Sequence, residues 1–277
     1  MTASVNLSPL NRPAGRPTTG AGGRPAATPT AVAVDLGSCT VGVWASHRGT
    51  LTGPCGDAFS SAGRLVRRGR VVDVDGCALL LDQLVRRYDE PLPAGAVVVA
   101  CRPLLAAESD QAAMRRVLDT VFAPSRILFV DAVRAAAIGS GAAAGTLLMA
   151  DIGAQVSEVA VLSQGRVVAA RRANVGTMDL AHGTAAGLLG DVVANQVRDL
   201  RRDLPAADLA AAKARGMLVV GDGALQPDLT MALSKLLRLR VHRAPTPRTA
   251  ALNGAALAAM AALRHPAPPR TRTWPVS

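Results

Sequence analysis

Aromatic side chains are nearly absent from this chain of 277 residues: they make up 2% of it, while hydrophobic residues as a whole make up 49%. So few rings exclude the stacking platforms that hold single-stranded nucleic acids. They also argue against a sugar site lined by aromatic rings. The high apolar content and the mean hydropathy of +0.25 exclude a chain that is disordered throughout. A globular protein with an aliphatic core is therefore expected.

The sequence also lacks a long uncharged apolar run. The longest uncharged stretch, 135–150, consists mainly of Ala and Gly and lies between Arg134 and Asp151. A membrane-spanning helix needs about 20 predominantly apolar residues, so a buried helix followed by a strand is expected here instead. Because the first residues contain no apolar core of a secretory signal, we expect a cytoplasmic protein without a transmembrane segment.

Closely spaced cysteines are missing as well. No two of them form a CxxC pair, so neither a zinc site nor a disulfide framework is predicted. We expect four buried free thiols, at Cys39, Cys55, Cys77 and Cys101.

Positive charge gathers at the two ends of the chain. The net charge is +11, and removing six terminal arginines leaves +5 for the body. Such tails attract polyanions and anionic lipid weakly, so weak peripheral membrane contact stays open. We expect no specific nucleic-acid binding, and the N-terminal arm has too few large apolar residues for an amphipathic anchor. The six arginines are Arg12, Arg16, Arg24, Arg264, Arg270 and Arg272.

Apolar runs alternate with helical patterns along the chain, which is typical of α/β proteins. Hairpins are predicted at 31–46 and 157–172. Further strands are predicted at 96–101, 126–130, 146–153, 217–220 and 240–242, and helices at 76–88, 108–122, 131–143, 178–204, 206–214, 224–237 and 248–263.

Two segments of the chain repeat one pattern. Val-Asp-Leu-Gly at 34–37 and Ala-Asp-Ile-Gly at 150–153 each end an apolar strand and begin a hairpin, which suggests two related halves. A strand that ends in Asp and Gly presents a carboxylate at the sheet edge where α/β proteins bind ligands, and the glycine lets backbone amides approach a phosphate. Two such edges facing each other would hold phosphates by their amides and a hydrated Mg²⁺ by Asp35 and Asp151.

With Val-Val-Gly-Asp-Gly-Ala at 219–224, these motifs resemble the nucleotide loops of the actin-like ATPase superfamily, most closely the bacterial MreB-type rod-shape-determining proteins. Residues 33–43 are similar to the first phosphate loop, 150–161 to the second and 217–225 to the adenosine loop. The similarity covers nearly everything from 31 to 263, including 64–85, 96–103, 134–141, 165–176 and 245–258.

The resemblance implies an actin-like (ribonuclease-H-like) duplicated α/β fold, with two lobes and a nucleotide cleft. The chain is short after Gly176 and between Ser46 and Arg64, so the family's peripheral subdomains are expected to be reduced or absent and the cleft shallow and wet. The expected parts are a disordered arm at 1–30, a first lobe at 31–143 completed by a C-terminal helix at 247–263, a second lobe at 144–246, and a Pro/Arg-rich tail at 264–277.

The resemblance also implies ATP and Mg²⁺ in the cleft, with Asp35 and Asp151 at the metal. The implied cofactor-binding residues are Asp35, Gly37, Ser38, Cys39, Thr40, Asp151, Gly153, Ala154, Gln155, Gly176, Gly221, Asp222 and Gly223.

Three departures from the family pattern bear on catalysis. The second loop reads Asp-Ile-Gly-Ala-Gln-Val at 151–156 where the family has Asp-Ile-Gly-Gly-Gly-Thr, so two side chains are added and a hydroxyl is lost. Asp-Ala-Val at 131–133 stands where the family has Glu-Glu-Pro, whose second Glu aligns the attacking water. Asp222 replaces a glycine. We expect at most a weak ATPase, with Asp151 as the one catalytic candidate and Glu158 as a surface charge in the second hairpin.

The leading hypothesis is an MreB-like cytoskeletal, cell-shape protein that binds ATP-Mg weakly and acts mainly through protein contacts. The implied partners are further copies of the chain, a full-length MreB-type protein, or proteins of cell-wall morphogenesis. The alternative is a pseudo-ATPase: a nucleotide-free scaffold or adaptor with an actin fold. A small-molecule kinase or exopolyphosphatase is disfavoured, because no catalytic carboxylate and no substrate walls are evident.

Overall fold

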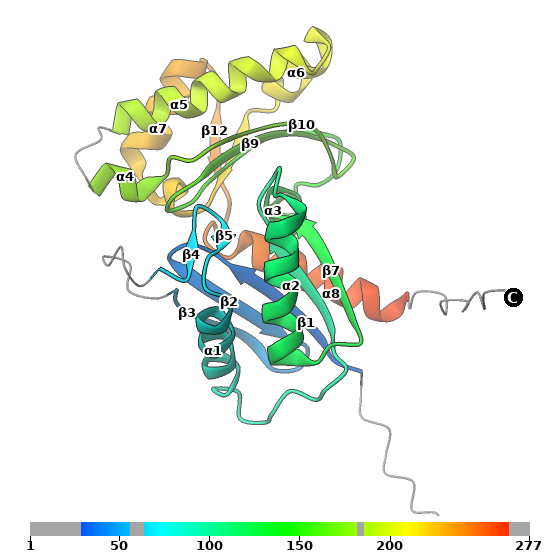
Figure 1. Cartoon of the computed structure of the whole chain (residues 1–277). Helices are drawn as coiled ribbons and strands as arrows, with labels where there is room; N and C mark the ends of the chain where they lie inside the picture. The colour runs from blue at the N-terminus through cyan, green and yellow to red at the C-terminus, as the bar shows by residue number, and fades with distance from the viewer. Residues whose placement is uncertain (1–28, 56–63, 182–185, 266–277) are drawn as a thin grey trace, which may run out of the picture.

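The structure, a computed structural model, describes residues 29–55, 64–181 and 186–265. The predicted arm at 1–30 and tail at 264–277 lie almost wholly outside the described residues. Figure 1 shows two lobes, each built on its own sheet.

The two five-stranded sheets have the same topology. In each sheet three consecutive strands pair antiparallel, and two later strands extend the sheet in parallel from the first of the three. The predicted α/β duplication is therefore confirmed. The first sheet runs β3-β2-β1-β6-β7, with β1 at Ala31–Leu36, β2 at Thr40–Ala45, β3 at Gly49–Pro54, β6 at Val97–Arg102 and β7 at Arg126–Asp131. The second runs β10-β9-β8-β11-β12, with β8 at Thr146–Ile152, β9 at Ser157–Ser163, β10 at Arg166–Ala173, β11 at Met217–Val220 and β12 at Val241–Arg243.

Helices cover both faces of each sheet, because the strands are apolar on both faces. The outer face of the first sheet packs against α1 (Val74–Val85) and α2 (Glu108–Phe122). The outer face of the second packs against α5 (Ala186–Asp199), α6 (Ala206–Ala214) and α7 (Pro227–Leu237). Short helical turns complete this lobe: α4 (Thr177–Ala181), η1 (Leu200–Arg202) and η2 (Asp222–Leu225).

The two lobes share a central layer of two alanine-rich helices, α3 (Ala132–Gly139) and α8 (Ala250–Arg264), which pack against both sheets. Their backbones nearly touch: a Cβ atom on Gly254 would lie 1.7 Å from the carbonyl oxygen of Ala135. Small residues at this crossing let the two helices fit between the sheets, so the lobes are joined by a common hydrophobic core.

The sequence prediction missed two strand pairings. The edge strand β3 is rich in Gly and Thr and mostly exposed, which gives a weak apolar signal. The hairpin of β4 (Val66–Arg67) and β5 (Arg70–Val71) is too short to show a period. The single helix predicted at 178–204 is instead α4, α5 and η1 over its described residues. Among the described helices, none is long and apolar enough to cross a bilayer.

Candidate functional site

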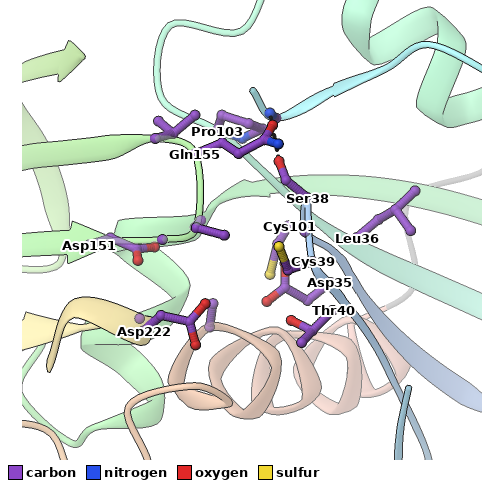
Figure 2. Close-up of a pocket in the computed structure, with 18 of the residues that line it drawn as sticks. Asp35, Leu36, Ser38, Cys39, Thr40, Cys101, Pro103, Asp151, Gln155 and Asp222 are labelled. Atoms are coloured by element: carbon purple, nitrogen blue, oxygen red, sulfur yellow. Dashed lines mark hydrogen bonds between the residues drawn. The ribbon is translucent and has the colours of Figure 1, made fainter. Parts of the chain in front are cut away.

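Asp35 and Asp151 occupy equivalent positions in the two sheets. Each is the second-last residue of its strand, β1 for Asp35 and β8 for Asp151. Asp35 lies two residues after Ala33, and Asp151 lies two residues after Met149, so each aspartate is on the strand face that packs against the central helices. Both carboxylates therefore turn toward the space between the lobes, and both line one cleft. Figure 2 shows them approaching this cleft from opposite walls.

The turns that follow these aspartates are also equivalent. The amide of Gly37 donates to the carbonyl of Thr40 at 2.9 Å, and the amide of Gly153 donates to the carbonyl of Val156 at the same distance. The two turns meet in the cleft, which they line with Gly37, Ser38, Cys39, Thr40, Gly153, Ala154, Gln155 and Val156.

Gly176 supports the second turn from behind and does not itself line the cleft. A Cβ atom on Gly176 would lie 2.5 Å from the carbonyl oxygen of Ala154. The start of α4 is held against the same turn, because the amides of Thr177 and Met178 donate to the carbonyls of Gly153 and Ala154 at 3.0 and 2.8 Å.

A third segment, at the end of β11, closes the second lobe's side of the cleft. Gly221 has a φ of +79°, a conformation that favours glycine, and it lines the cleft with Asp222. The Asp222 carboxylate accepts a hydrogen bond of 2.6 Å from the Arg248 guanidinium, so its charge is paired. Gly223 is buried against Ile152 and lies outside the cleft lining.

The two aspartates of the cleft have no counter-charge in the described part of the chain, where neither carboxylate makes a hydrogen bond or ion pair. Burial raises the pKa of Asp35 to about 6. Burial, followed by the charges of Asp35 and Asp222, raises the pKa of Asp151 to about 7. Two close carboxylates in an unpaired state form an oxygen-only site that favours a hard cation.

Several of the residues that depart from the family pattern line the cleft. Two of them, Ala132 and Val156, have apolar side chains. Asp131, one position before Ala132, is engaged elsewhere, since it forms an ion pair of 2.8 Å with Arg102. No carboxylate therefore stands where the family's water-aligning Glu is expected.

The prediction that Glu158 is a surface charge was wrong. Its side chain is 4% exposed and lines the cleft. Its Oε1 atom accepts a hydrogen bond of 2.8 Å from the Leu104 amide, and it lies 3.9 Å from Nε of Arg172. Burial and the charge of Asp151 raise the pKa of Glu158 well above its usual range. The reason is that β9 lies between β8 and β10 and is covered on both faces, so the carboxylate faces the other lobe.

The β4–β5 hairpin bridges the mouth of the cleft. The Arg68 amide donates to Oε1 of Gln155 at 2.8 Å, and the Gly69 amide donates to Oγ of Ser38 at 3.4 Å. From the second lobe, the Arg172 guanidinium donates to the Arg68 carbonyl at 2.5 Å. The cleft volume is about 140 Å³, below the roughly 300–1,000 Å³ of most ligand pockets. The cleft is therefore small, and the hairpin contacts both of the turns that line it.

Comparisons with known proteins show similar folds among solved structures and one family match. The family model described as MreB/Mbl protein matches residues 60–184. The MreB 5 structure of Spiroplasma citri bound to AMPPNP aligns with a TM-score of 0.75 and 16% identity, over 86% of this chain and 98% of that one. The ADP-bound structure of the same protein gives 0.70 and 16%, over 83% and 96%. The ethanolamine utilization protein EutJ of Carboxydothermus hydrogenoformans gives 0.61 and 18%, over 84% and 91%. Comparison with curated protein sequences gives no match.

Proposed function

We propose that this chain, which has the actin-like fold and matches the MreB/Mbl family model over residues 60–184, is a bacterial cytoskeletal protein of cell shape that binds ATP with Mg²⁺ weakly between its lobes. It acts in the cytoplasm, mainly through contacts with copies of itself, a full-length MreB-type protein, or proteins of cell-wall morphogenesis.

The placement of Asp35 and Asp151 carries this proposal. They end equivalent strands of a duplicated fold and meet in one cleft, beside the hydroxyl groups of Ser38 and Thr40. Glycine begins the turn after each aspartate, which leaves room for phosphate oxygens near the backbone. The adenine nucleotides bound to the similar MreB 5 of Spiroplasma citri support ATP as the ligand.

The donor set fits Mg²⁺. Magnesium prefers oxygen ligands and keeps several waters, so it is bound through one or two carboxylates together with substrate phosphates. The cleft offers two carboxylates without a protein partner, and the described residues contain no cluster of three metal-binding side chains. Asp35 and Asp151 would hold the hydrated ion, which would offset the charge of the phosphates.

Three features support weak binding and slow hydrolysis. The side chains of Gln155 and Val156 occupy the second turn, where the resemblance implies glycine and threonine. The hairpin is bonded to both turns, so a bound nucleotide would compete with it for Gln155 and Ser38. Ala132 stands at the place of the water-aligning Glu and has no group that could orient water or accept its proton, a role that typically contributes 10²–10⁴-fold to the rate.

Isothermal titration of the full chain with ATP tests the proposal, in the presence of Mg²⁺ and then of EDTA. We expect saturable binding that depends on Mg²⁺. Asp35→Asn removes one anionic ligand but also one charge that repels phosphate. The variant should therefore bind Mg-ATP about tenfold more weakly, while metal-free ATP binds at least as well as to the original chain.

The matched control is Asp119→Asn, which neutralises an exposed aspartate on α2. It should leave both affinities unchanged. Absence of heat at millimolar Mg-ATP, with folded protein, would refute nucleotide binding.

One alternative, a scaffold that binds no nucleotide, is favoured by two specific contacts. Gln155 is bonded to the hairpin and Asp222 is paired with Arg248, so both cleft walls are satisfied without a ligand. If the chain is such a scaffold, Asp35→Asn should leave partner binding unchanged, and Mg-ATP should not raise the melting temperature.

A further inference from the structure

A second groove lies beside the β4–β5 hairpin and has a volume of about 730 Å³. Both lobes contribute to it: the hairpin and the loops after β5 and β6 from the first, and β10 with the residue that follows it from the second. The lining residues are Arg67, Arg68, Arg70, Val71, Val72, Leu105, Arg172 and Asn174.

Positive charge dominates this arginine groove. Arg67 and Arg70 are direct cross-strand partners in the hairpin, an arrangement in which like charges destabilise each other. Asp110 neutralises Arg70 at 2.9 Å. Arg67 is exposed and makes no ion pair with any described residue. The hairpin therefore keeps an excess of positive charge that a further anion would offset.

The second lobe adds a guanidinium that is held in place. Arg172 donates to the carbonyls of Leu104 and Arg68 at 3.1 and 2.5 Å and lies 3.9 Å from Glu158. The Arg68 guanidinium donates to the Asn174 carbonyl. Among the described residues, four guanidiniums thus meet two carboxyl groups around the groove, those of Asp110 and Glu158.

Apolar side chains flank the arginines. Leu105 is 74% exposed and Val72 is 57% exposed. Leu105 has a φ of +55°, a backbone conformation that residues other than glycine rarely adopt. Such a conformation persists only where the surrounding structure imposes it. The preceding residue is fixed on both sides, because the Leu104 amide donates to Glu158 and its carbonyl accepts from Arg172. The packing therefore holds Leu105 out toward solvent.

We propose that the arginine groove binds an acidic segment of a partner protein, with carboxylates on Arg67 and its neighbours and an apolar side chain against Leu105 and Val72. The groove is far larger than one phosphate needs, and its apolar flanks match a peptide better than a small anion. Because the groove is recessed between two lobes, an extended chain enters it more readily than a flat lipid surface does.

Fluorescence anisotropy of the full chain tests this at physiological salt, with a labelled peptide of Glu-Glu-Leu repeats as the probe. The peptide should bind, whereas Gln-Gln-Leu repeats should not. Arg67→Glu should weaken binding by about tenfold. Asn tolerates the positive φ of position 105, so Leu105→Asn should fold normally. It should weaken the binding of the peptide and leave the binding of tripolyphosphate unchanged.

The matched control is Arg201→Glu, which reverses an exposed arginine on η1 of the second lobe. Its peptide affinity should stay within about twofold of the original chain. Equal losses in the two arginine variants would overturn the proposal, because general charge would then explain binding. It is also overturned if the peptide does not bind, or if tripolyphosphate or anionic phosphatidylglycerol vesicles bind in preference to it.

Discussion

The backbone amide of Arg68 donates a hydrogen bond of 2.8 Å to the side-chain Oε1 of Gln155. This bond joins the β4–β5 hairpin of the first lobe to the turn at 153–156 in the second lobe, which resembles the family's second phosphate loop. Gln155 stands where the resemblance implies glycine, so one side chain both narrows the cleft and ties the lobes together.

Replacing this side chain should open the cleft. Gln155→Gly removes the acceptor for the Arg68 amide and frees space in the second turn. We expect Mg-ATP affinity to rise by about tenfold and amide exchange across 66–71 to become faster. Titration calorimetry and hydrogen exchange measure both. Gln83→Ala, on the exposed side of α1, is the control; the same affinity in both variants would show that Gln155 does not restrict the site.

The buried carboxylate of Glu158 should matter for stability in a way that depends on its substitute. Glu158→Ala leaves the buried Leu104 amide without its acceptor and removes the carboxyl group beside Arg172, at a cost of about 2 kcal/mol. Glu158→Gln keeps an oxygen for the amide and resembles the protonated form that the raised pKa favours, so it should cost less than about 1 kcal/mol. Urea denaturation distinguishes them, and equal losses would contradict the described contacts.

Asp35 and Asp151 predict the pH dependence of the nucleotide-free chain. Their pKa values of about 6 and about 7 in the folded state lie above the ordinary 3.8, so the folded state binds more protons than the unfolded state between these values. This contribution to stability is complete below about pH 4 and is lost as the pH rises through the folded-state values.

The loss has a slope of up to about 1.4 kcal/mol per pH unit for each extra proton. Urea denaturation from acid to neutral pH should therefore show a steeper fall for the original chain than for the Asp35→Asn, Asp151→Asn double variant. Mg²⁺ should restore part of the stability at neutral pH. Parallel curves for the two proteins would contradict the raised pKa values.

The crossing of α3 and α8 should not tolerate a single added methyl group. Gly254→Ala places a Cβ atom against the Ala135 carbonyl and forces the two helices apart, with an expected loss of about 3 kcal/mol. Gly187→Ala is the matched control, because no atom lies within 4 Å of its added Cβ on α5. There, alanine should stabilise the helix by about 0.5–1 kcal/mol. Thermal unfolding tests both, and similar melting temperatures would refute the close packing.

The sequence was sufficient for the fold because its strongest signals are local. The two apolar strands that end in Asp and Gly, near Asp35 and Asp151, predicted the duplication. The helix predicted at 108–122 has the same bounds as α2. The order of strands and helices then restricts the topology to a few choices. The strands that were not predicted are short or lie at a sheet edge: β3 has mostly exposed Gly and Thr residues, and the β4–β5 hairpin has two residues in each strand.

The site was less accessible to sequence reasoning, because its remaining members come together only by tertiary packing. Glu158 lies in a strand of the predicted hairpin at 157–172, but nothing local shows that its side chain is buried against the Leu104 amide of the first lobe. The pairing of Arg248 with Asp222 joins segments that are distant in the chain. Gly69 and Arg68 reach the cleft through a hairpin that has no periodic pattern, so the narrowing of the cleft could not be foreseen.

Hydrogen exchange of the two equivalent turns, with and without Mg-ATP, tests most directly whether the lobes share one nucleotide site. The account predicts that amides at 37–40 and 153–156 become protected together, with the same dependence on ligand concentration, and that Asp35→Asn shifts both curves alike. Protection of one turn only, or of neither at millimolar Mg-ATP, would contradict it.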